Sequence, residues 1–311
     1  MGSTRNADAA DSNRPIPSTQ HPAPSTQHPR RRFALGGLVG GLAGLGLTGG
    51  ALVHEARYVN PYRPVLERVE LALPPDHDGL AGLRIAFVTD THVGPFFSPD
   101  DVARATALLT PERPDLLLLG GDHISESPRY AAPTAEVLGE LVAATPLGGY
   151  AVLGNHDVFE GRDPAITAAL NRVGIAVLRN AATEVVTDHG SLWIAGLDEA
   201  VQARADPRAT FRAIPAGAAA LALWHEPEWA EHSSAFGAFA QLSGHTHGGQ
   251  VRLPGIGPLS LPSGGRRHVI GLTHAAGMPI YTSRGVGVYR PPVRLNCPPE
   301  VTLITLIPSA N

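Results

Sequence analysis

Histidine pairs are the feature of this 311-residue sequence whose residue type and spacing most directly suggest chemistry. His245 and His247 stand two residues apart in "GHTHGG", directly after an apolar run. If the backbone there is extended, side chains alternate between faces, so both imidazoles project to the same side. Neutral imidazoles aimed into one space suit a metal ion, and a surface loop is the alternative that this stretch alone leaves open.

Carboxylates, an amide and further histidines stand in the same kind of position elsewhere. Each lies at or just past the end of an apolar run: Asp90 and His92, Asp122, Asn155 with His156, and His225. Asp and Asn favour turns for local reasons, and a lone His225 in "WHEP" is typical of a partly buried histidine. In layered α/β folds, however, ligands bind where the loops beyond the strand ends converge. Placement after five separate runs therefore predicts one site.

The elements that must position these residues are short apolar runs bounded by Gly, Pro or Asp, which predict strands. We expect strands at 83–90, 115–122, 149–157, 174–178, 191–198, 220–227 and 239–247, and later at 250–253, 279–283 and 301–307. Helix-like segments lie between them, and Ser98, Asp163 and Asp206 each precede a proline as an expected helix cap. The alternation predicts an α/β fold with helices covering the sheets.

The donor set itself limits the metal chemistry. It holds two carboxylates, one amide and up to five imidazoles, without a thiolate. Mixed oxygen and imidazole ligands favour Mn, Fe or Zn over Ca or Mg. Eight candidates are too many for one four-coordinate ion, whereas two ions that share a carboxylate would use them. Two-metal sites catalyse in-line displacement at phosphorus.

The motifs "TDTH", "GGDH", "GNHD", "WHEP" and "GHTH", in this order from about 83 to 247, resemble those of the calcineurin-like metallophosphoesterases. The extension "GHTHGGQVRLP", the closing "YTSRGVGVYRPPVRLNCPPEVTLITL" and the N-terminal segment are similar to the YkuE/YaeI-like exported or membrane-associated bacterial branch. Relatives of that branch include a lipid A precursor pyrophosphatase. The resemblance covers nearly all of the chain after Val53 and implies a four-layer α/β/β/α sandwich of two mixed sheets flanked by helices.

The resemblance also implies roles for the candidate residues. It assigns three ligands to each metal and one bridging ligand: Asp90, His92 and His247; Asn155, His225 and His245; and Asp122 between the two ions. His156 would be catalytic and protonate the leaving oxygen, while a metal-bridging hydroxide would attack phosphorus. Manganese is the expected metal, with iron and zinc as alternatives.

One position departs from the family pattern. Many members carry an aspartate at the position of Ser125, where it orients the catalytic histidine. We expect either Asp157 or Glu126 to compensate, or His156 to be less well oriented. A metal-bound tyrosine at this position marks the purple acid phosphatase branch, so Ser125 argues against that branch. His123 is not a motif ligand and is expected to be solvated.

The N-terminal residues form two expected regions. Residues 1–29 are polar and proline-rich, which predicts a disordered tail. Residues 30–56 are expected to be a twin-arginine-like signal or membrane anchor, because Arg30, Arg31 and Phe33 match Arg-Arg-x-Phe. The uncharged run from Phe33 to Val53 has 21 residues, near the roughly 20 that cross a bilayer. An ordinary signal-anchor is the alternative, and both predict an extracytoplasmic metallophosphoesterase domain at 57–311, membrane-associated through 33–53 if the signal is uncleaved.

The composition of the chain limits which classes of ligand and partner it can bind. The net charge is −4 and all 24 cationic residues are arginine, which gives no basic footprint for nucleic acid. The single cysteine, Cys297, excludes an intramolecular disulfide and a thiolate metal cluster. We expect a monomer that hydrolyses a phosphomonoester, phosphodiester or pyrophosphate bond of a phosphorylated small-molecule or lipid-linked substrate. The alternatives are a UDP-diacylglucosamine-type pyrophosphatase of the membrane surface, a nuclease, and a non-catalytic metal-binding envelope protein.

Overall fold

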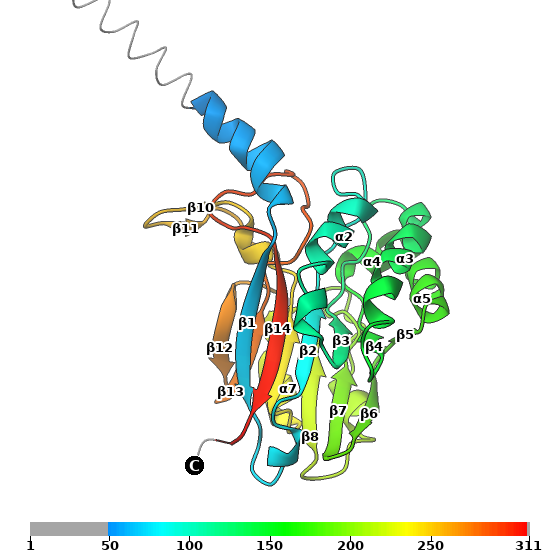
Figure 1. Ribbon diagram of the computed structural model, residues 1–311. Coiled ribbons are helices and arrows are strands. Elements are labelled where there is room, and N and C mark those ends of the chain that lie inside the picture. The colour runs from blue at the N-terminus through cyan, green and yellow to red at the C-terminus, as the bar shows by residue number, and fades with distance from the viewer. Residues whose placement is uncertain (1–48, 310–311) are drawn as a thin grey trace, which may run out of the picture. The chain divides into compact units, whose positions relative to one another are not determined.

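Two six-stranded sheets form the centre of the protein (Figure 1). The computed structural model describes residues 49–309, and both sheets belong to the compact unit Gly50–Asn311. The first sheet contains, in spatial order, β1 (Val65–Ala72), β14 (Glu300–Ile307), β2 (Arg84–Val88), β3 (Leu116–Leu119), β4 (Gly149–Ala151) and β5 (Ile175–Val177). The second contains β12 (Gly271–Ala275), β13 (Met278–Thr282), β9 (Ala240–Ser243), β8 (Ala219–Leu223), β7 (Gly190–Gly196) and β6 (Ala181–Thr187).

Both sheets are mixed, with parallel strands at their centres. In the first sheet β2, β3, β4 and β5 run parallel, while β14 pairs antiparallel with β2 and parallel with β1. In the second, β13, β9, β8 and β7 run parallel, and β12 and β6 pair antiparallel at the two edges. Parallel neighbours bring the carboxyl ends of several strands to one edge, where the loops that follow them meet.

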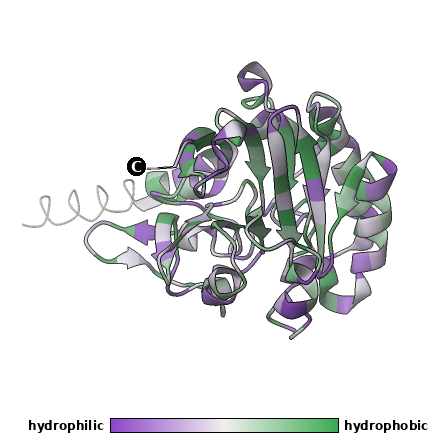
Figure 2. Ribbon diagram, turned by 90° about the horizontal axis from the view of Figure 1, so that it is seen from below, coloured by the Kyte–Doolittle hydropathy of each residue, from purple (hydrophilic) through white to green (hydrophobic). Residues whose placement is uncertain are grey.

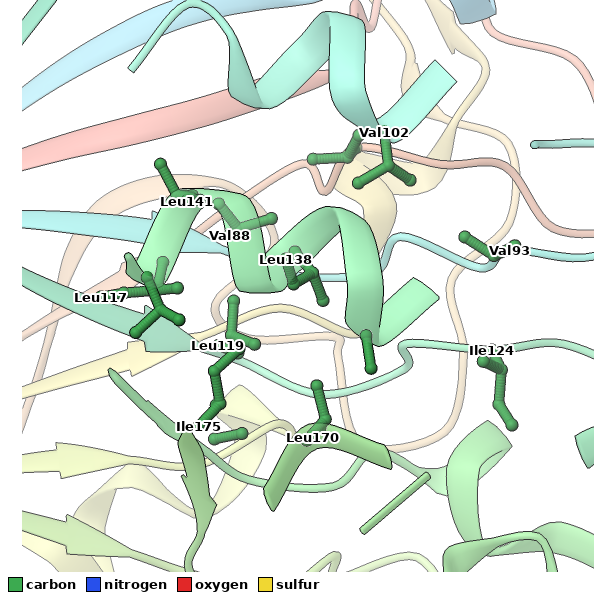
Figure 3. Close-up of a cluster of buried hydrophobic side chains, with 14 of the residues drawn as sticks. Val88, Val93, Val102, Leu117, Leu119, Ile124, Leu138, Leu141, Leu170 and Ile175 are labelled. Atoms are coloured by element: carbon green, nitrogen blue, oxygen red, sulfur yellow. The ribbon is translucent and has the colours of Figure 1, made fainter. Parts of the chain in front are cut away.

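Alternating side chains in the central strands separate three apolar cores. Ile85 and Phe87 of β2 lie in the core between the sheets, while Ala86 and Val88 face the helices. The helix-side core, shown in Figure 3, packs the first sheet against α2 (Pro99–Thr106), α3 (Ala131–Val142) and α5 (Asp163–Arg172). Both faces of these strands are buried, which explains why their sequences are continuous apolar runs.

The outer face of the second sheet has its own core against α6 (Pro207–Phe211) and α7 (Ala230–Ala235), with Trp224 as its largest buried side chain. Figure 2 shows hydrophobic residues concentrated along the strands and hydrophilic residues on helices and loops. Helix, sheet, sheet and helix thus form four layers. The predicted α/β/β/α sandwich is confirmed.

Two of the three expected helix caps form. Ser98 accepts a hydrogen bond from the Asp101 amide at the start of α2, and Asp206 accepts one from the Ala209 amide at the start of α6. The expected cap at Asp163 is wrong, because α5 already includes Asp163. Its carboxylate instead lies 2.7 Å from Arg179 Nη1.

Three strands of the two large sheets were not expected from the sequence, and all three are edge strands: β1, β6 and β12. Their burial alternates between exposed and half-buried positions, so they contain no apolar run. The strand expected at 250–253 belongs to neither large sheet. It forms β10 (Arg252–Leu253), which pairs with β11 (Gly257–Pro258) in a separate hairpin.

The expected tail at 1–29 and most of the expected signal or anchor at 30–56 lie outside the described residues. Within residues 49–309, no helix combines the length and the apolar character needed to span a membrane.

Candidate metal centre

The seven predicted metal ligands meet at one edge of the two sheets. Asp90 and His92 follow β2, Asp122 follows β3 and Asn155 follows β4, all from the first sheet. His225 follows β8, and His245 and His247 follow β9, from the second sheet. All seven side chains are buried. The strands end two to four residues before these ligands, so the ligands lie beyond the strands, and Asn155 begins the short helix α4 (Asn155–Val158).

The loops after β2 and β3 are held side by side by their backbones. The Asp90 amide donates to the Gly121 carbonyl at 2.9 Å, and the His92 amide donates to the Asp122 carbonyl at 3.0 Å. Just beyond, Val93 and Ile124 form a parallel bridge and bury their side chains in the helix-side core (Figure 3). Core packing on both sides of the loops therefore fixes the positions of the carboxylates.

The ligand-bearing backbone is not extended. Five of the seven ligands have positive φ angles: Asp90 at 53°, His92 at 44°, Asp122 at 52°, His245 at 70° and His247 at 50°. Residues other than glycine rarely adopt this left-handed region, and such strained residues cluster at functional sites. The expectation that His245 and His247 share a face of an extended segment is wrong. The left-handed turns point their rings into two different groups of ligands.

The first group joins Asp90, His92 and His247, whose ligand atoms all lie within 4.8 Å of one another. The Nε2 atoms of His92 and His247 are 2.9 Å apart, and His247 Nε2 is 3.3 Å from Asp90 Oδ1. The second group joins Asp122, His225 and His245 within the same limit. The first triad has the members that the resemblance assigns to the first ion, while the second contains Asp122 in place of Asn155.

Asp122 lies between the two groups. Its Oδ2 is 3.4 Å from His92 Nε2 in the first group and 3.2 Å from His225 Nε2 in the second. Its other oxygen, Oδ1, accepts the His156 amide at 2.7 Å. One oxygen thus faces both groups while a backbone bond fixes the carboxylate plane, which suits a bridging ligand.

The hydrogen bonds around the imidazoles leave one ring nitrogen of each available for a metal. His225 Nδ1 donates to the Gly120 carbonyl at 2.7 Å, and His245 Nε2 donates to the Ser263 carbonyl at 2.7 Å. Because a carbonyl can only accept, the neutral His245 ring carries its lone pair on Nδ1. His225 Nε2 faces Asp122 Oδ2 at 3.2 Å. Such outer partners typically orient metal-ligating histidines.

Asn155 provides a second sign that a cation belongs here. Its Oδ1 lies 3.0 Å from His245 Nδ1. With the His245 proton on Nε2, both facing atoms are acceptors, and two buried acceptors at this distance repel each other. A cation between them satisfies both. The donor set therefore fits two divalent ions, although the assignment of each ligand to an ion stays a prediction.

Electrostatics in the first group favour neutral rings. Burial lowers the pKa of His92 to about 3. Burial, together with nearby His92 and Arg294, also holds the pKa of His247 well below its usual value. Burial raises the pKa of Asp90 to about 7, despite the opposing influence of His225. Near neutral pH the two imidazoles are ready to bind a metal, and Asp90 must give up a proton to do so.

The second group holds an ion pair. Burial opposes the charge on His225, but Asp122 and Asp90 outweigh it and raise the pKa of His225 well above 6.5. Burial likewise opposes ionisation of Asp122, but His225 and His156 outweigh it and hold the pKa of Asp122 well below its usual value. Burial lowers the pKa of His245 to about 4. A metal that binds here would replace the proton shared by this pair.

His156 lines the cavity, and the expected compensation for Ser125 by Asp157 or Glu126 is not seen in the described structure. Ser125 Oγ is 2.7 Å from His92 Nδ1, so it supports a predicted metal ligand. Asp157 accepts from backbone amides, including that of Ile124 at 3.1 Å, and Glu126 pairs with Arg290. Within the described residues none of these three side chains hydrogen-bonds the His156 ring.

The His156 ring is held by aromatic packing. The Tyr289 ring centroid is 4.1 Å away, and that of Phe159 is 5.3 Å away in an edge-to-face arrangement. Tyr289 belongs to the quoted closing stretch, but its type gave no signal for this role. The Tyr289 contact joins two distant parts of the chain and cannot be read from a motif.

Two other supporting features were missed. The Arg294 side chain is fully buried and donates to the carbonyls of Arg284, Gly285 and Gly287, the segment that packs behind Asp90. Gly154 approaches Asp122 so closely that a Cβ there would lie 2.2 Å from Asp122 Oδ1. A larger residue at position 154, in the motif "GNHD", would therefore clash with the Asp122 carboxylate.

Three further polar side chains are buried. His123 was expected to be solvated, but it is buried and its Nε2 bonds the Val152 carbonyl at 3.0 Å. Arg284 is largely buried in ion pairs with Glu67 and Glu300. Cys297 is also buried.

A cavity of about 370 Å³ opens above the two groups. Five predicted ligands, His92, Asp122, Asn155, His245 and His247, line its bottom together with His156; we call the seven ligands the floor. Val251 and residues 259–262 also line the cavity; they flank the β10–β11 hairpin, and we call them the hairpin wall. Tyr289 and Arg290 line the cavity as well, and we call them the rim.

This fold and site define the class of the protein. Residues 83–249 match the family model of the calcineurin-like phosphoesterases, so the chain belongs to that family and is a metal-dependent phosphoester hydrolase.

Curated bacterial relatives agree with this assignment. The chain is 31% identical to the "Uncharacterized metallophosphoesterase YkuE" of Bacillus subtilis over 89% of this chain and 97% of that protein. It is 35% identical to the "Phosphodiesterase YaeI" of Escherichia coli over 74% of this chain and 84% of that protein. An uncharacterized metallophosphoesterase of Aquifex aeolicus is 31% identical over 74% of this chain and 87% of its own length. The predicted family and bacterial branch are confirmed.

Proposed function

We propose that this phosphoesterase hydrolyses a phosphoester or pyrophosphate bond of a lipid-linked molecule at the extracytoplasmic face of a membrane. The observation that carries the proposal is the two-sided lining of the cavity. Its floor consists of polar metal ligands, whereas its hairpin wall contributes four apolar residues: Val251, Leu259, Leu261 and Pro262. A substrate that fits both surfaces has a phosphate at one end and an apolar part beside it.

The floor residues and His156 would divide the chemistry. When bound, two divalent ions would supply Lewis-acid polarisation of the phosphoryl oxygens and a water acidic enough to attack at neutral pH. We propose manganese as the metal. His156, at the junction of floor and rim, would donate a proton to the leaving oxygen. Asp122 would hold the His156 backbone in place through the 2.7 Å bond to its amide.

The rim offers a second contact for the phosphate. Arg290 lines the cavity and its guanidinium forms a 2.8 Å ion pair with Glu126. The Arg290 side chain is 60% exposed, so this pair is weakly held, and a substrate phosphate can compete for the guanidinium. Since the Escherichia coli relative is named a phosphodiesterase, we favour a diester over a monoester.

Location at a membrane follows from the sequence before the domain. Arg30, Arg31 and Phe33 match a twin-arginine signal, and the uncharged run that ends at Val53 is long enough to anchor the chain. We propose that residues 57–311 act as a monomeric extracytoplasmic domain. An anchored enzyme meets lipid-linked substrates at a high local concentration.

The test is hydrolysis by the full chain, reconstituted with Mn, Fe, Zn or Co, of aryl phosphates, bis-aryl phosphates and pyrophosphates. Each headgroup is offered with a short and a long alkyl chain below its micelle concentration. The proposal predicts that kcat/KM rises with chain length for at least one headgroup. Equal rates for short and long chains would contradict the lipid-linked substrate, and inactivity with all four metals would contradict hydrolysis itself.

A further inference from the structure

We infer that the tip of the β10–β11 hairpin inserts into a lipid bilayer surface and places the mouth of the cavity against that surface. The inference rests on the proposed function only in locating the chain at a membrane. Ile256, at the hairpin tip, is 73% exposed, the largest exposure of any large hydrophobic residue in the described part of the chain. Leu259, 59% exposed, lies between this tip and the cavity that it lines.

A second group of exposed apolar residues lies at the same end of the domain. Residues 49–54 form a helix whose Leu52 and Val53 are 51% and 65% exposed, and Tyr58 follows at 61%. Figure 1 shows this helix and the hairpin projecting from the same end. Large exposed apolar groups gathered at one end of a protein mark an interaction surface.

The helix and the hairpin are joined through residues 294–296. The Arg294 amide donates to the Ala56 carbonyl at 2.8 Å, next to the helix. One residue on, the Leu295 carbonyl accepts the Arg252 amide at 2.9 Å, and Asn296 Nδ2 donates to the Arg252 carbonyl at 2.9 Å. These bonds hold the hairpin and the helix as parts of one surface.

Cations lie on the same surface beside the cavity. The guanidinium of Arg57 is 5.6 Å from the centroid of the Phe96 ring, and that of Arg290 is 5.2 Å from it. Arg57 belongs to the helical segment, while Arg290 lines the cavity rim. Arginines beside exposed apolar residues such as Tyr58 match the anionic headgroups of a membrane.

The exposed apolar residues of the hairpin and helix must be covered by something, and the sequence before the helix leads us to propose a lipid bilayer. The uncharged run from Phe33 ends at Val53, within the exposed helix, and three arginines precede it. A run of this length is near the roughly 20 residues that cross a bilayer, so it would deliver the exposed helix and the hairpin to the lipid surface. The other occupants, the run itself folded back or a second copy of the chain, become outcomes of the test.

The experiment measures the surroundings of the hairpin tip directly. Ile256→Cys in the full chain is labelled with an environment-sensitive fluorophore; the native Cys297 is buried, so the new thiol is the accessible one. The labelled protein is reconstituted into phosphatidylethanolamine and phosphatidylglycerol vesicles with or without brominated acyl chains. The matched control is Val186→Cys, 66% exposed on the distant edge strand β6.

We expect blue-shifted emission at position 256 and its quenching by brominated lipid, with neither effect at position 186. Emission typical of water at both positions overturns the inference. Blue-shifted emission without quenching by brominated lipid also overturns it, because protein then covers the tip.

A second variant connects insertion with turnover. Ile256→Asp is expected to lower hydrolysis of a vesicle-embedded substrate about tenfold or more, since burial of isoleucine in lipid is lost. Its rate on a soluble aryl phosphate stays at the wild-type value, whereas Val186→Asp changes neither rate. A protein with a quenched tip but no turnover refutes the proposed function alone, and turnover with an aqueous tip refutes this inference alone.

Discussion

The floor of the cavity and its hairpin wall differ in burial and in support: the floor residues are buried and held by hydrogen bonds, whereas the wall includes an exposed apolar side chain. Every floor residue is buried and follows a central strand, and hydrogen bonds with the Ser125 hydroxyl and with the Gly120 and Ser263 carbonyls orient three of its four imidazoles. The hairpin wall flanks a two-stranded unit outside both sheets, and its Leu259 exposes most of its side chain. The comparison indicates that the reaction is fixed by the core, while substrate choice belongs to an element that can vary without disturbing the core.

Asp122→Asn should have the largest effect. Asparagine keeps Oδ1 for the His156 amide but removes the charge at Oδ2, which faces both ligand groups. We expect hydrolysis of a bis-aryl phosphate to fall to background, and elemental analysis to find fewer than two metals per chain. Asp115→Asn, before β3 at the opposite end of that strand, is the control and should keep both. An active Asp122→Asn protein would show that the Asp122 carboxylate does not bridge the two metal ions.

His156→Gln should lower turnover by about 10²–10⁴-fold, the usual contribution of a positioned general acid. Metal content should stay unchanged, because His156 belongs to neither ligand triad. Kinetics and elemental analysis on the same preparation check both statements. If metal were lost together with activity, His156 would be a metal ligand and not only a general acid.

Ser125→Ala should weaken metal affinity or activity by about 10- to 100-fold, which is typical for loss of an outer partner of a metal-binding histidine. Ser125 Oγ is the partner of His92 Nδ1, so the ring loses its orientation. Titration of the metal-free protein with Mn measures the change. Ser127→Ala, whose hydroxyl accepts only the Arg129 amide in the described structure, is the matched control. Equal affinity in both variants would contradict the role of Ser125.

Metal affinity should also depend on pH. Burial raises the pKa of Asp90 to about 7, so below that pH the metal must displace its proton. The raised pKa of His225 acts in the same direction. Affinity for Mn should therefore fall as pH drops below about 7, by up to about tenfold per pH unit for each displaced proton. Calorimetric titrations between about pH 5 and 8 that give one constant affinity would contradict this electrostatic account of the floor.

Leu259→Ser in the hairpin wall should have the smallest effect and the most selective one. We expect KM for a long-chain phosphodiester to rise about three- to tenfold, because part of the roughly 1.5–3 kcal/mol for burying a leucine is lost. Hydrolysis of a short-chain diester should change little. Leu272→Ser, an exposed leucine on β12, serves as control. Equal effects on both substrates would show that the wall does not distinguish apolar groups.

The contrast between floor and wall also explains which features the sequence could predict. The ligands of the floor follow strands that are buried on both faces, and such strands appear as continuous apolar runs. Each apolar run therefore predicted a strand and also the position of the polar residue that follows it. The edge strands β1, β6 and β12 have alternating, half-exposed patterns and were missed. The run at 250–253 was interpreted as a sheet strand because β10 has the same local composition.

The sequence by itself determined the α/β class, through the periodicity of its apolar runs, and the seven residues that gather at one edge, through their positions after those runs. The order of its motifs determined the family, and the resemblance to that family supplied the four layers. The tertiary structure alone decided how the ligands point. His245 and His247 separate into two groups through left-handed backbone turns, not through alternation along a strand. Ser125 supports His92, Tyr289 packs on His156, and Arg294 braces the segment behind Asp90. These contacts join residues far apart in the chain, so only packing of the two sheets and their loops could fix them.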